Sequence, residues 1–246
     1  MKPTLMLSLT VSLGLAGFMP NVCVDRESRP DNWCFHPDIA IAPAGTGVYV
    51  AYEVDSLAGY VTVRSDVRFQ KSTDAGKTWL PHGLLLRCGE LFASTPDVTT
   101  DHAGNIYVVF TEQPSSSEGH LFSMRSNDSG SSWSAPVKID DNVAAVAVGW
   151  SRVAADSAGN LFVAWNYFRT GISHIWSSVS TDRGTTWGPN VRVDNDTVSD
   201  DHCHPDVFVQ PGTNDYLVVL TAPFWVSEHY MNSHSVLYRS TDCGKT

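Results

Sequence analysis

The chain has 246 residues, of which 42% are hydrophobic and 17% are charged, and its formal net charge is −10. This length and composition predict a globular chain of one large or two small domains rather than a disordered one. The negative charge and the lack of a basic run exclude nucleic acid as an expected partner, because nucleic-acid-binding proteins concentrate Lys and Arg.

The first segment, residues 1–22, has the pattern of a secretory signal peptide. A lysine precedes an apolar run from Leu5 to Phe18 that is too short for a membrane span. Gly14 and Ala16 have the spacing of a cleavage site, so we expect cleavage near residues 16–22. A buried N-terminal strand or helix is the alternative. The first interpretation predicts a secreted, periplasmic or cell-surface protein with no membrane span once the signal is removed.

Residues 23–35 form a lead-in to the rest of the chain, which contains five cysteines in total. An exported protein can form disulfides, but an odd number cannot pair completely. Cys23 and Cys34 are close enough in sequence to form a bridge. The spacing of the other three leaves their pairing open.

From residue 36 onward the sequence repeats itself. Each copy begins with a short alternating run, a Gly-containing turn and a β-branched and aromatic run, which is the pattern of a β-hairpin. A third run, a polar turn and, in the complete copies, a fourth run follow, with no helical periodicity. The hairpins occupy residues 36–53, 95–112, 150–167 and 204–221.

Four strands in each repeat predict one blade of a β-propeller. We therefore expect an all-β protein in which residues 36–246 form a β-propeller of four-stranded antiparallel blades. The predicted blades are residues 36–94, 95–149, 150–203 and an incomplete fourth at 204–246.

The polar turn before each fourth strand reads Ser-x-Asp-x-Gly-x-(Ser/Thr)-Trp, and its serines are 54, 54 and 60 residues apart. The Asp can accept hydrogen bonds from amides ahead of it, the Gly permits a positive φ, and the Trp can pack beneath the turn. Because the motif recurs once per blade, we interpret it as structural. Its members are Ser72, Asp74, Gly76 and Trp79; Ser126, Asp128, Gly130 and Trp133; Ser180, Asp182, Gly184 and Trp187; and Ser240, Asp242 and Gly244.

This motif resembles the Asp-box, or bacterial neuraminidase repeat, of the sialidase superfamily, and the resemblance covers residues 36–246. It implies a propeller of six or more blades, so that further downstream blades would be needed to close the ring. It also implies a glycan or glycoconjugate as ligand and a sialidase-type glycoside hydrolase as one possible activity. Asp boxes occur in other propellers too, so a non-catalytic secreted or cell-surface interaction scaffold is the alternative.

The resemblance to sialidases requires three arginines for the substrate carboxylate, a Tyr nucleophile paired with a Glu, and an Asp acid/base. The first blade opens "CFHPDIAIAP", without the expected Arg, and no Tyr nucleophile is identifiable. Arg152 is a candidate for one arginine of the triad, and Asp38 or Asp55 for the acid/base. We therefore expect an incomplete sialidase site in this chain.

The top face of the propeller, where each first strand begins, is the expected place for a ligand. Superposed repeats put His36, Thr95, Trp150 and His204 in one ring, and Asp38, Asp97, Arg152 and Asp206 in the next. The carboxylates could bind glycan hydroxyls or act as an acid/base pair. Alternatively, they bind neighbouring backbone, and Arg152 forms an ion pair between blades. The candidate ligand-binding residues are His36, Glu53, Asp97, Glu112, Trp150, Arg152, His204 and Asp206.

The stretch "SDDHCHPD" at residues 199–206 offers a weaker candidate for a metal site. His202, His204 and Asp206 alternate, so in an extended strand they would share one face, and two imidazoles with a carboxylate suit a transition metal. Pro205 disturbs the strand, and the other repeats lack the His202 pattern. No phosphate-binding loop, Cys-pair zinc motif or G-x-S-x-G motif is present, and we expect no cofactor.

Overall fold

The computed structural model describes residues 23–24, 32–87, 92–115, 118–141, 148–167, 172–194, 202–210, 215–227 and 230–244. The predicted signal peptide, Cys88 and most of the lead-in lie outside these residues. The described part of the chain forms fifteen β-strands and contains no helix, and so offers no helical membrane span.

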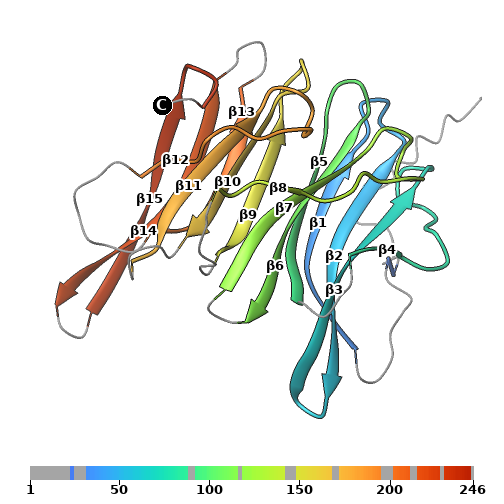
Figure 1. Ribbon diagram of the computed structural model, residues 1–246, viewed down its shortest axis with the longest axis horizontal. Coiled ribbons are helices and arrows are strands. Elements are labelled where there is room, and N and C mark those ends of the chain that lie inside the picture. The colour runs from blue at the N-terminus through green and yellow to red at the C-terminus, as the bar shows by residue number, and fades with distance from the viewer. Residues whose placement is uncertain are drawn as a thin grey trace, which may run out of the picture.

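Four antiparallel sheets follow one another along the chain (Figure 1), and within each the strands pair in sequence order. The first contains β1 (Asn32–Ile41), β2 (Val48–Ala58), β3 (Val61–Ser72) and β4 (Leu84–Arg87). The second contains β5 (Phe92–Thr100), β6 (Ile106–Ser115), β7 (Glu118–Ser126) and β8 (Val137–Lys138). The third contains β9 (Val148–Ala155), β10 (Leu161–Tyr167), β11 (His174–Ser180) and β12 (Val191–Arg192). The fourth contains β13 (Cys203–Val209), β14 (Tyr216–Ser227) and β15 (Tyr230–Ser240).

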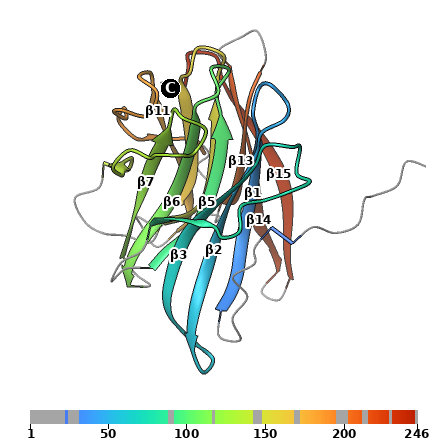
Figure 2. The ribbon, with the colours of Figure 1, turned by 90° about the vertical axis from the view of Figure 1, so that its right-hand side faces the viewer.

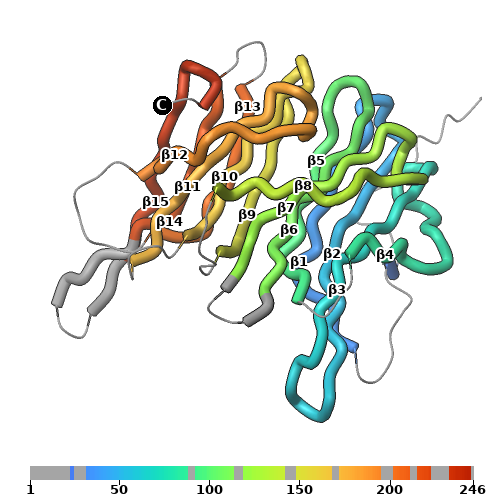
Figure 3. The backbone as a smooth tube through the Cα atoms, viewed as in Figure 1, coloured from blue at the N-terminus to red at the C-terminus, as the bar shows by residue number. Residues whose placement is uncertain are grey.

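The first strands of successive sheets, β1, β5, β9 and β13, contact one another in that order. Separate hydrophobic clusters fill the space between the first and second, second and third, and third and fourth sheets. Sheets that pack face to face around a row of inner strands are blades, so the predicted all-β propeller fold is confirmed. Figure 2 shows β1, β2 and β3 side by side, and Figure 3 traces the chain from one blade to the next. The top face points downward in Figure 1.

The tryptophans of the second and third polar turns, Trp133 and Trp187, contact the preceding blade. Trp133 of the second blade meets the buried ring of Phe69 in the first blade edge-on, with ring centroids 5.0 Å apart. The indole Nε1 of Trp187 in the third blade donates to Ser123 Oγ of the second at 3.0 Å. These partly buried side chains therefore pack between two blades.

The polar turns have the hydrogen bonds that their sequence predicts. In the first turn, Ser72 Oγ donates to Asp74 Oδ1 (2.7 Å) and accepts from the Gly76 amide (2.9 Å). The amide and hydroxyl of Thr78 donate to the two oxygens of Asp74, at 2.8 and 2.7 Å. These bonds, led by that from the Thr78 hydroxyl, lower the pKa of Asp74 to about 2. The Ser and Asp bonds recur in the second and third turns, so the motif forms one repeated local structure.

The turn glycines allow a direct test of packing between blades. Gly76 and Gly130 have φ values of 83° and 77°, so alanine is strained at both, by about 1–2 kcal/mol. A Cβ at Gly130 would lie 2.5 Å from the Phe69 ring, whereas at Gly76 the nearest atom is 3.9 Å away. We expect Gly130→Ala to lower the free energy of unfolding by about 1–3 kcal/mol more than Gly76→Ala, as overpacking does. Urea denaturation measures both costs, and equal costs would contradict the contact between the second turn and the first blade.

Candidate functional site

Each first strand carries an irregularity at the top face. The residue at this position has a positive φ in all four blades: 46° for His36, 48° for Thr95, 47° for Trp150 and 53° for His204. The pairing of each first strand with its second strand shifts register at this point. Positive φ is uncommon outside glycine and is strained for a β-branched residue such as Thr95. Bulges of this kind redirect side chains and often lie beside functional sites.

Side chains of the preceding blade hold the bulges in place. The Thr95 amide donates to Glu53 Oε2 at 3.0 Å, and the His204 amide donates to Asn166 Oδ1 at 3.0 Å. Glu53 and Asn166 both come from second strands, and the former is 5% exposed and the latter fully buried. The strained backbone is therefore stabilised by hydrogen bonds between blades.

The ring of aspartates also connects blades. Asp38 Oδ2 accepts from the Val98 amide and Asp97 Oδ2 accepts from the Val153 amide, both at 2.7 Å and both in the next blade. Arg152 Nη1 lies 3.4 Å from Asp97 Oδ1. These contacts match the alternative interpretations of the sequence: the aspartates bind neighbouring backbone, and Arg152 forms an ion pair between blades.

The other predicted carboxylates have local partners. Asp55 accepts from Ser65 Oγ at 2.5 Å and from Thr62 Oγ1 at 3.1 Å. Glu112 forms an ion pair with Arg87. Asp206 accepts from the amide of the residue that follows it, at 3.0 Å.

A pocket of about 350 Å³ lies at the top face across the first three blades. His36, Glu53, Thr95 and Trp150 are among its lining residues, and the Trp150 residue is 40% exposed. His36 Nδ1 lies 2.9 Å from Glu53 Oε2. An aromatic surface beside a few fixed polar groups is typical of a site for a small polar ligand. The structure thus brings His36, Glu53 and Trp150 together.

The remaining candidates lie around this pocket rather than in its lining. The ring of His204 is 5.1 Å from that of Trp150, centroid to centroid. The described lining of the pocket does not include the other candidates, which are Asp38, Asp55, Asp97, Glu112, Arg152 and Asp206.

Two pairs of neighbouring carboxyl groups near the top face have unequal environments. Burial raises the pKa of Glu53, and the neighbouring Asp55 raises it further, against the hydrogen bonds from Thr95 and His36. Burial and then the charge of Asp38 raise the pKa of Asp97 well above its usual range, against the attraction of Arg152. A buried carboxyl group with a raised pKa is one of the groups used in acid/base chemistry.

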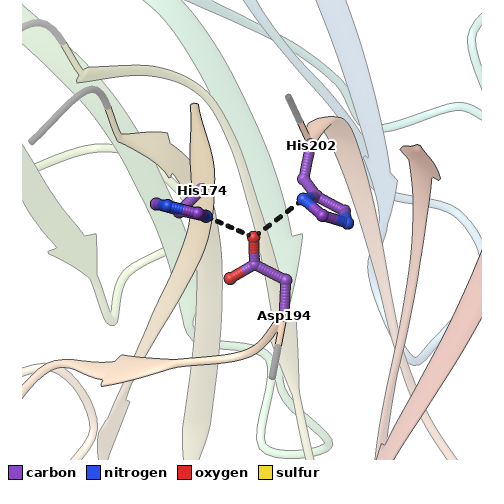
Figure 4. A group of neighbouring side chains, drawn as sticks. All are labelled: His174, Asp194 and His202. Atoms are coloured by element: carbon purple, nitrogen blue, oxygen red, sulfur yellow. Dashed lines mark hydrogen bonds and ion pairs between the residues drawn. The ribbon is translucent and has the colours of Figure 1, made fainter. Parts of the chain in front are cut away.

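A second cluster lies between the third and fourth blades (Figure 4). The Nδ1 atoms of His174 and His202 lie 2.9 and 3.1 Å from the same oxygen, Oδ2 of Asp194. The ligand atoms of these three described residues lie within 4.8 Å of one another, which is close enough for them to share a metal ion.

The expected group of His202, His204 and Asp206 is not assembled. The prediction assumed an extended strand, but the bulge at His204, with φ of 53°, breaks the alternation of side chains. His204 Nδ1 instead lies 3.2 Å from Cys203 Sγ. His202 therefore joins residues that are distant in sequence.

Sequence reasoning missed His174 and Asp194, although a signal was present. His120 and His174 both stand six residues before the serine of their polar turn, and Asp140 and Asp194 both stand fourteen residues after it. In the second blade, His120 Nδ1 lies 3.0 Å from Asp140 Oδ1, which is the same pairing. A repeated His and Asp at fixed distances from a structural motif indicates a contact within the blade.

The raised pKa of Glu53 predicts a specific pH dependence of stability. Because the folded-state pKa lies above the unfolded one, the folded state binds more protons in this interval, and stability falls as pH rises through it. Glu53→Gln keeps an acceptor for the Thr95 amide but does not titrate. We expect the melting temperature of the wild type to fall relative to that of the variant as pH rises from about 4 to 8, because an unperturbed Glu titrates near 4.3. Thermal unfolding of both proteins across this range measures the difference, and parallel curves would contradict a raised pKa of Glu53.

No protein-family model matches the chain, and no curated protein sequence matches it. Solved structures do. The leech intramolecular trans-sialidase matches with a TM-score of 0.66 at 12% identity, and the match covers 94% of this chain and 52% of the trans-sialidase chain. The Hadza microbial sialidase Hz136 matches with a TM-score of 0.61 at 19% identity, and the match covers 87% of this chain and 45% of the sialidase chain. The Penicillium chrysogenum alpha-L-arabinanase matches with a TM-score of 0.61 at 18% identity, and the match covers 87% of this chain and 64% of the arabinanase chain. The chain therefore spans less than two thirds of each of these proteins, and at these identities the likeness establishes the β-propeller fold.

Proposed function

We propose that this chain is part of an exported, sialidase-like Asp-box propeller that binds a glycan in its top-face pocket. The observation that carries the proposal is the 40% exposed residue Trp150 in the same pocket as the His36–Glu53 pair. An aromatic face can pack against the apolar face of a sugar ring while an imidazole and a carboxyl group bind its hydroxyls.

The similar structures support a carbohydrate ligand. They are named as a sialidase, a trans-sialidase and an arabinanase, and the last is in complex with arabinobiose. Since those chains are longer, we further propose that additional blades complete the ring in the whole protein. Export rests on the signal-peptide pattern of residues 1–22.

The charge of the pocket favours a neutral sugar. Among the described residues that line it, none is Lys or Arg, and the carboxyl group of Glu53 belongs to it. The nearby guanidinium of Arg152 lies 3.4 Å from Asp97. An anionic sugar such as sialic acid would find no Lys or Arg among these described lining residues to bind its carboxylate.

Glycoside hydrolysis is a second candidate, favoured by the Glu53–Asp55 pair. The raised pKa of Glu53 suits a general acid, and the adjacent Asp55 supplies the second carboxyl group that glycoside hydrolysis uses. The arginine triad and Tyr nucleophile of sialidases are not identified in this chain, so this candidate rests on the Glu53–Asp55 pair alone.

Removal of the aromatic surface should weaken glycan binding. We expect Trp150→Ala to reduce affinity for neutral oligosaccharides about tenfold or more, equivalent to about 1.4 kcal/mol. Isothermal titration calorimetry against a panel of arabinose-, galactose- and glucose-containing oligosaccharides measures this. The control is Tyr60→Ala, because Tyr60 is 96% exposed and outside the pocket lining. Equal losses in the two variants, or an unchanged affinity in Trp150→Ala, would refute binding in this pocket.

The pocket also predicts a negative result with sialosides. A fluorogenic sialoside should not be hydrolysed by the protein, because Arg152 is paired with Asp97 and the sialidase residues are incomplete. A steady-state fluorescence assay measures turnover. Hydrolysis that is abolished by Arg152→Ala would show that the sialidase site is present.

A further inference from the structure

We propose that His174, Asp194 and His202 bind a divalent transition-metal ion, zinc in the first instance, which links the third and fourth blades. His174 begins β11, Asp194 follows β12, and His202 immediately precedes β13. Figure 4 shows the two imidazoles directed at one oxygen of the carboxylate from opposite sides. The ligands thus come from three segments that only the folded protein brings together.

The separations of the ligand atoms suit a shared ion. The two Nδ1 atoms lie 2.9 and 3.1 Å from Asp194 Oδ2, and the ligand atoms of all three residues lie within 4.8 Å of one another. Ligands of a tetrahedral zinc ion with bonds of about 2.0–2.1 Å are roughly 3.3 Å apart. The two nitrogen–oxygen separations therefore need to change by only a few tenths of an ångström, and the two imidazole nitrogens, at most 4.8 Å apart, have to close to the same spacing. Without an ion, Nδ1–H groups can donate to the same oxygen, so the arrangement persists in both states.

The cluster is buried and its carboxylate is oriented. Asp194 is fully buried, the His202 side chain is 1% exposed and that of His174 is 12% exposed. Arg192 Nε donates to Asp194 Oδ1 at 2.8 Å, which leaves Oδ2 for the two imidazoles. Hydrogen bonds to a ligating carboxylate fix its orientation and are a regular feature of metal sites.

The backbone of His202 is also held. Its amide donates to the Ser173 carbonyl at 2.9 Å, and its carbonyl accepts from Ser173 Oγ at 2.8 Å and from Asn166 Nδ2 at 2.9 Å. A ligand whose backbone is fixed loses little freedom when it binds an ion.

The second blade provides an internal comparison. His120 and Asp140 repeat the His–Asp pair there, with Lys138 Nζ 3.5 Å from the carboxylate in the place of Arg192. The residue 54 positions before His202 is Val148, a buried apolar side chain that cannot bind a metal. The His–Asp pair is thus common to two blades, whereas the third ligand is confined to the interface between the third and fourth.

That interface differs in another respect. Asp38 and Asp97 each accept an amide from the next blade, but Arg152 occupies the corresponding position of the third blade. The amide of Val207, which would be its partner, donates instead to Asp206 Oδ1. A metal ion at His174, Asp194 and His202 would supply a link between blades where the aspartate link is absent.

Zinc binding to the full chain tests the proposal. The protein is stripped with EDTA and titrated with ZnCl₂; bound metal is measured by inductively coupled plasma mass spectrometry after desalting, and the melting temperature by calorimetry. We expect about one zinc ion per chain and a melting temperature that rises with zinc concentration, since the ion binds the folded state. His174→Ala and His202→Ala should lose both effects. His120→Ala, which breaks the matching pair, and His204→Ala, which removes the neighbouring histidine, should retain them.

Wild-type protein that takes up no zinc, or histidine variants that bind it as the wild type does, would overturn the proposal. Circular dichroism establishes whether each variant folds. If both histidine variants fail to fold, the visible spectrum of the cobalt-loaded wild type decides. Intense tetrahedral d–d bands support the site, and the weak spectrum of hydrated cobalt rejects it.

Discussion

Hydrogen bonds from the first strand of one blade to side chains of the preceding blade determine how the blades fit together. Hydrophobic packing between sheets supplies most of the stabilisation, but it is not directional. The bonds from Val98 to Asp38 and from Val153 to Asp97 have direction, and a buried amide that lost its partner would cost about 1–3 kcal/mol. At the opposite end, Lys71 and Arg125 donate to the polar turn of the next blade, but these exposed contacts contribute less. The position of each inner strand is therefore set mainly at the top face.

The same constraint explains why the top face can carry a site. Each of these first strands has a bulge residue two positions before the aspartate position. In two of them the amide of the bulge residue donates to a side chain of the preceding blade, Glu53 or Asn166. Positive φ at four non-glycine residues costs free energy that blade packing has to offset, and such strain persists where the surrounding structure enforces it. His36, Thr95 and Trp150 consequently project from fixed backbone around one pocket. A ligand there would meet pre-positioned groups, which lowers the entropic cost of binding.

Sequence reasoning was most successful where the physics is local and repeated. The turn bonds of Ser72 and Asp74, and the positive φ of Gly76, follow from residue types within one short segment. The equivalence of His36, Thr95, Trp150 and His204 followed from the repeat, but their bulges did not, because no single residue type requires them. Pro37, Pro96 and Pro205 follow three of the four, which in retrospect marks the break in the strands. The role of Arg152 depended on which blade its partner came from, and only the packed structure identifies Asp97.

The candidate metal site shows the limit of sequence patterns more clearly. Alternation placed His202 with two near neighbours, whereas its partners are 28 and 8 residues earlier in the chain, at His174 and Asp194. Two departures from the repeat, His202 for Val148 and Arg152 for the usual aspartate, fall at one interface, and that coincidence is visible only in three dimensions.

A crystal structure of the protein with a bound neutral oligosaccharide tests the central claim most directly. The account predicts a sugar ring against the indole of Trp150, with hydroxyl groups bound to Glu53 and His36. A sugar bound at the polar-turn end or on the outer strands, with the Trp150 pocket empty, would contradict it.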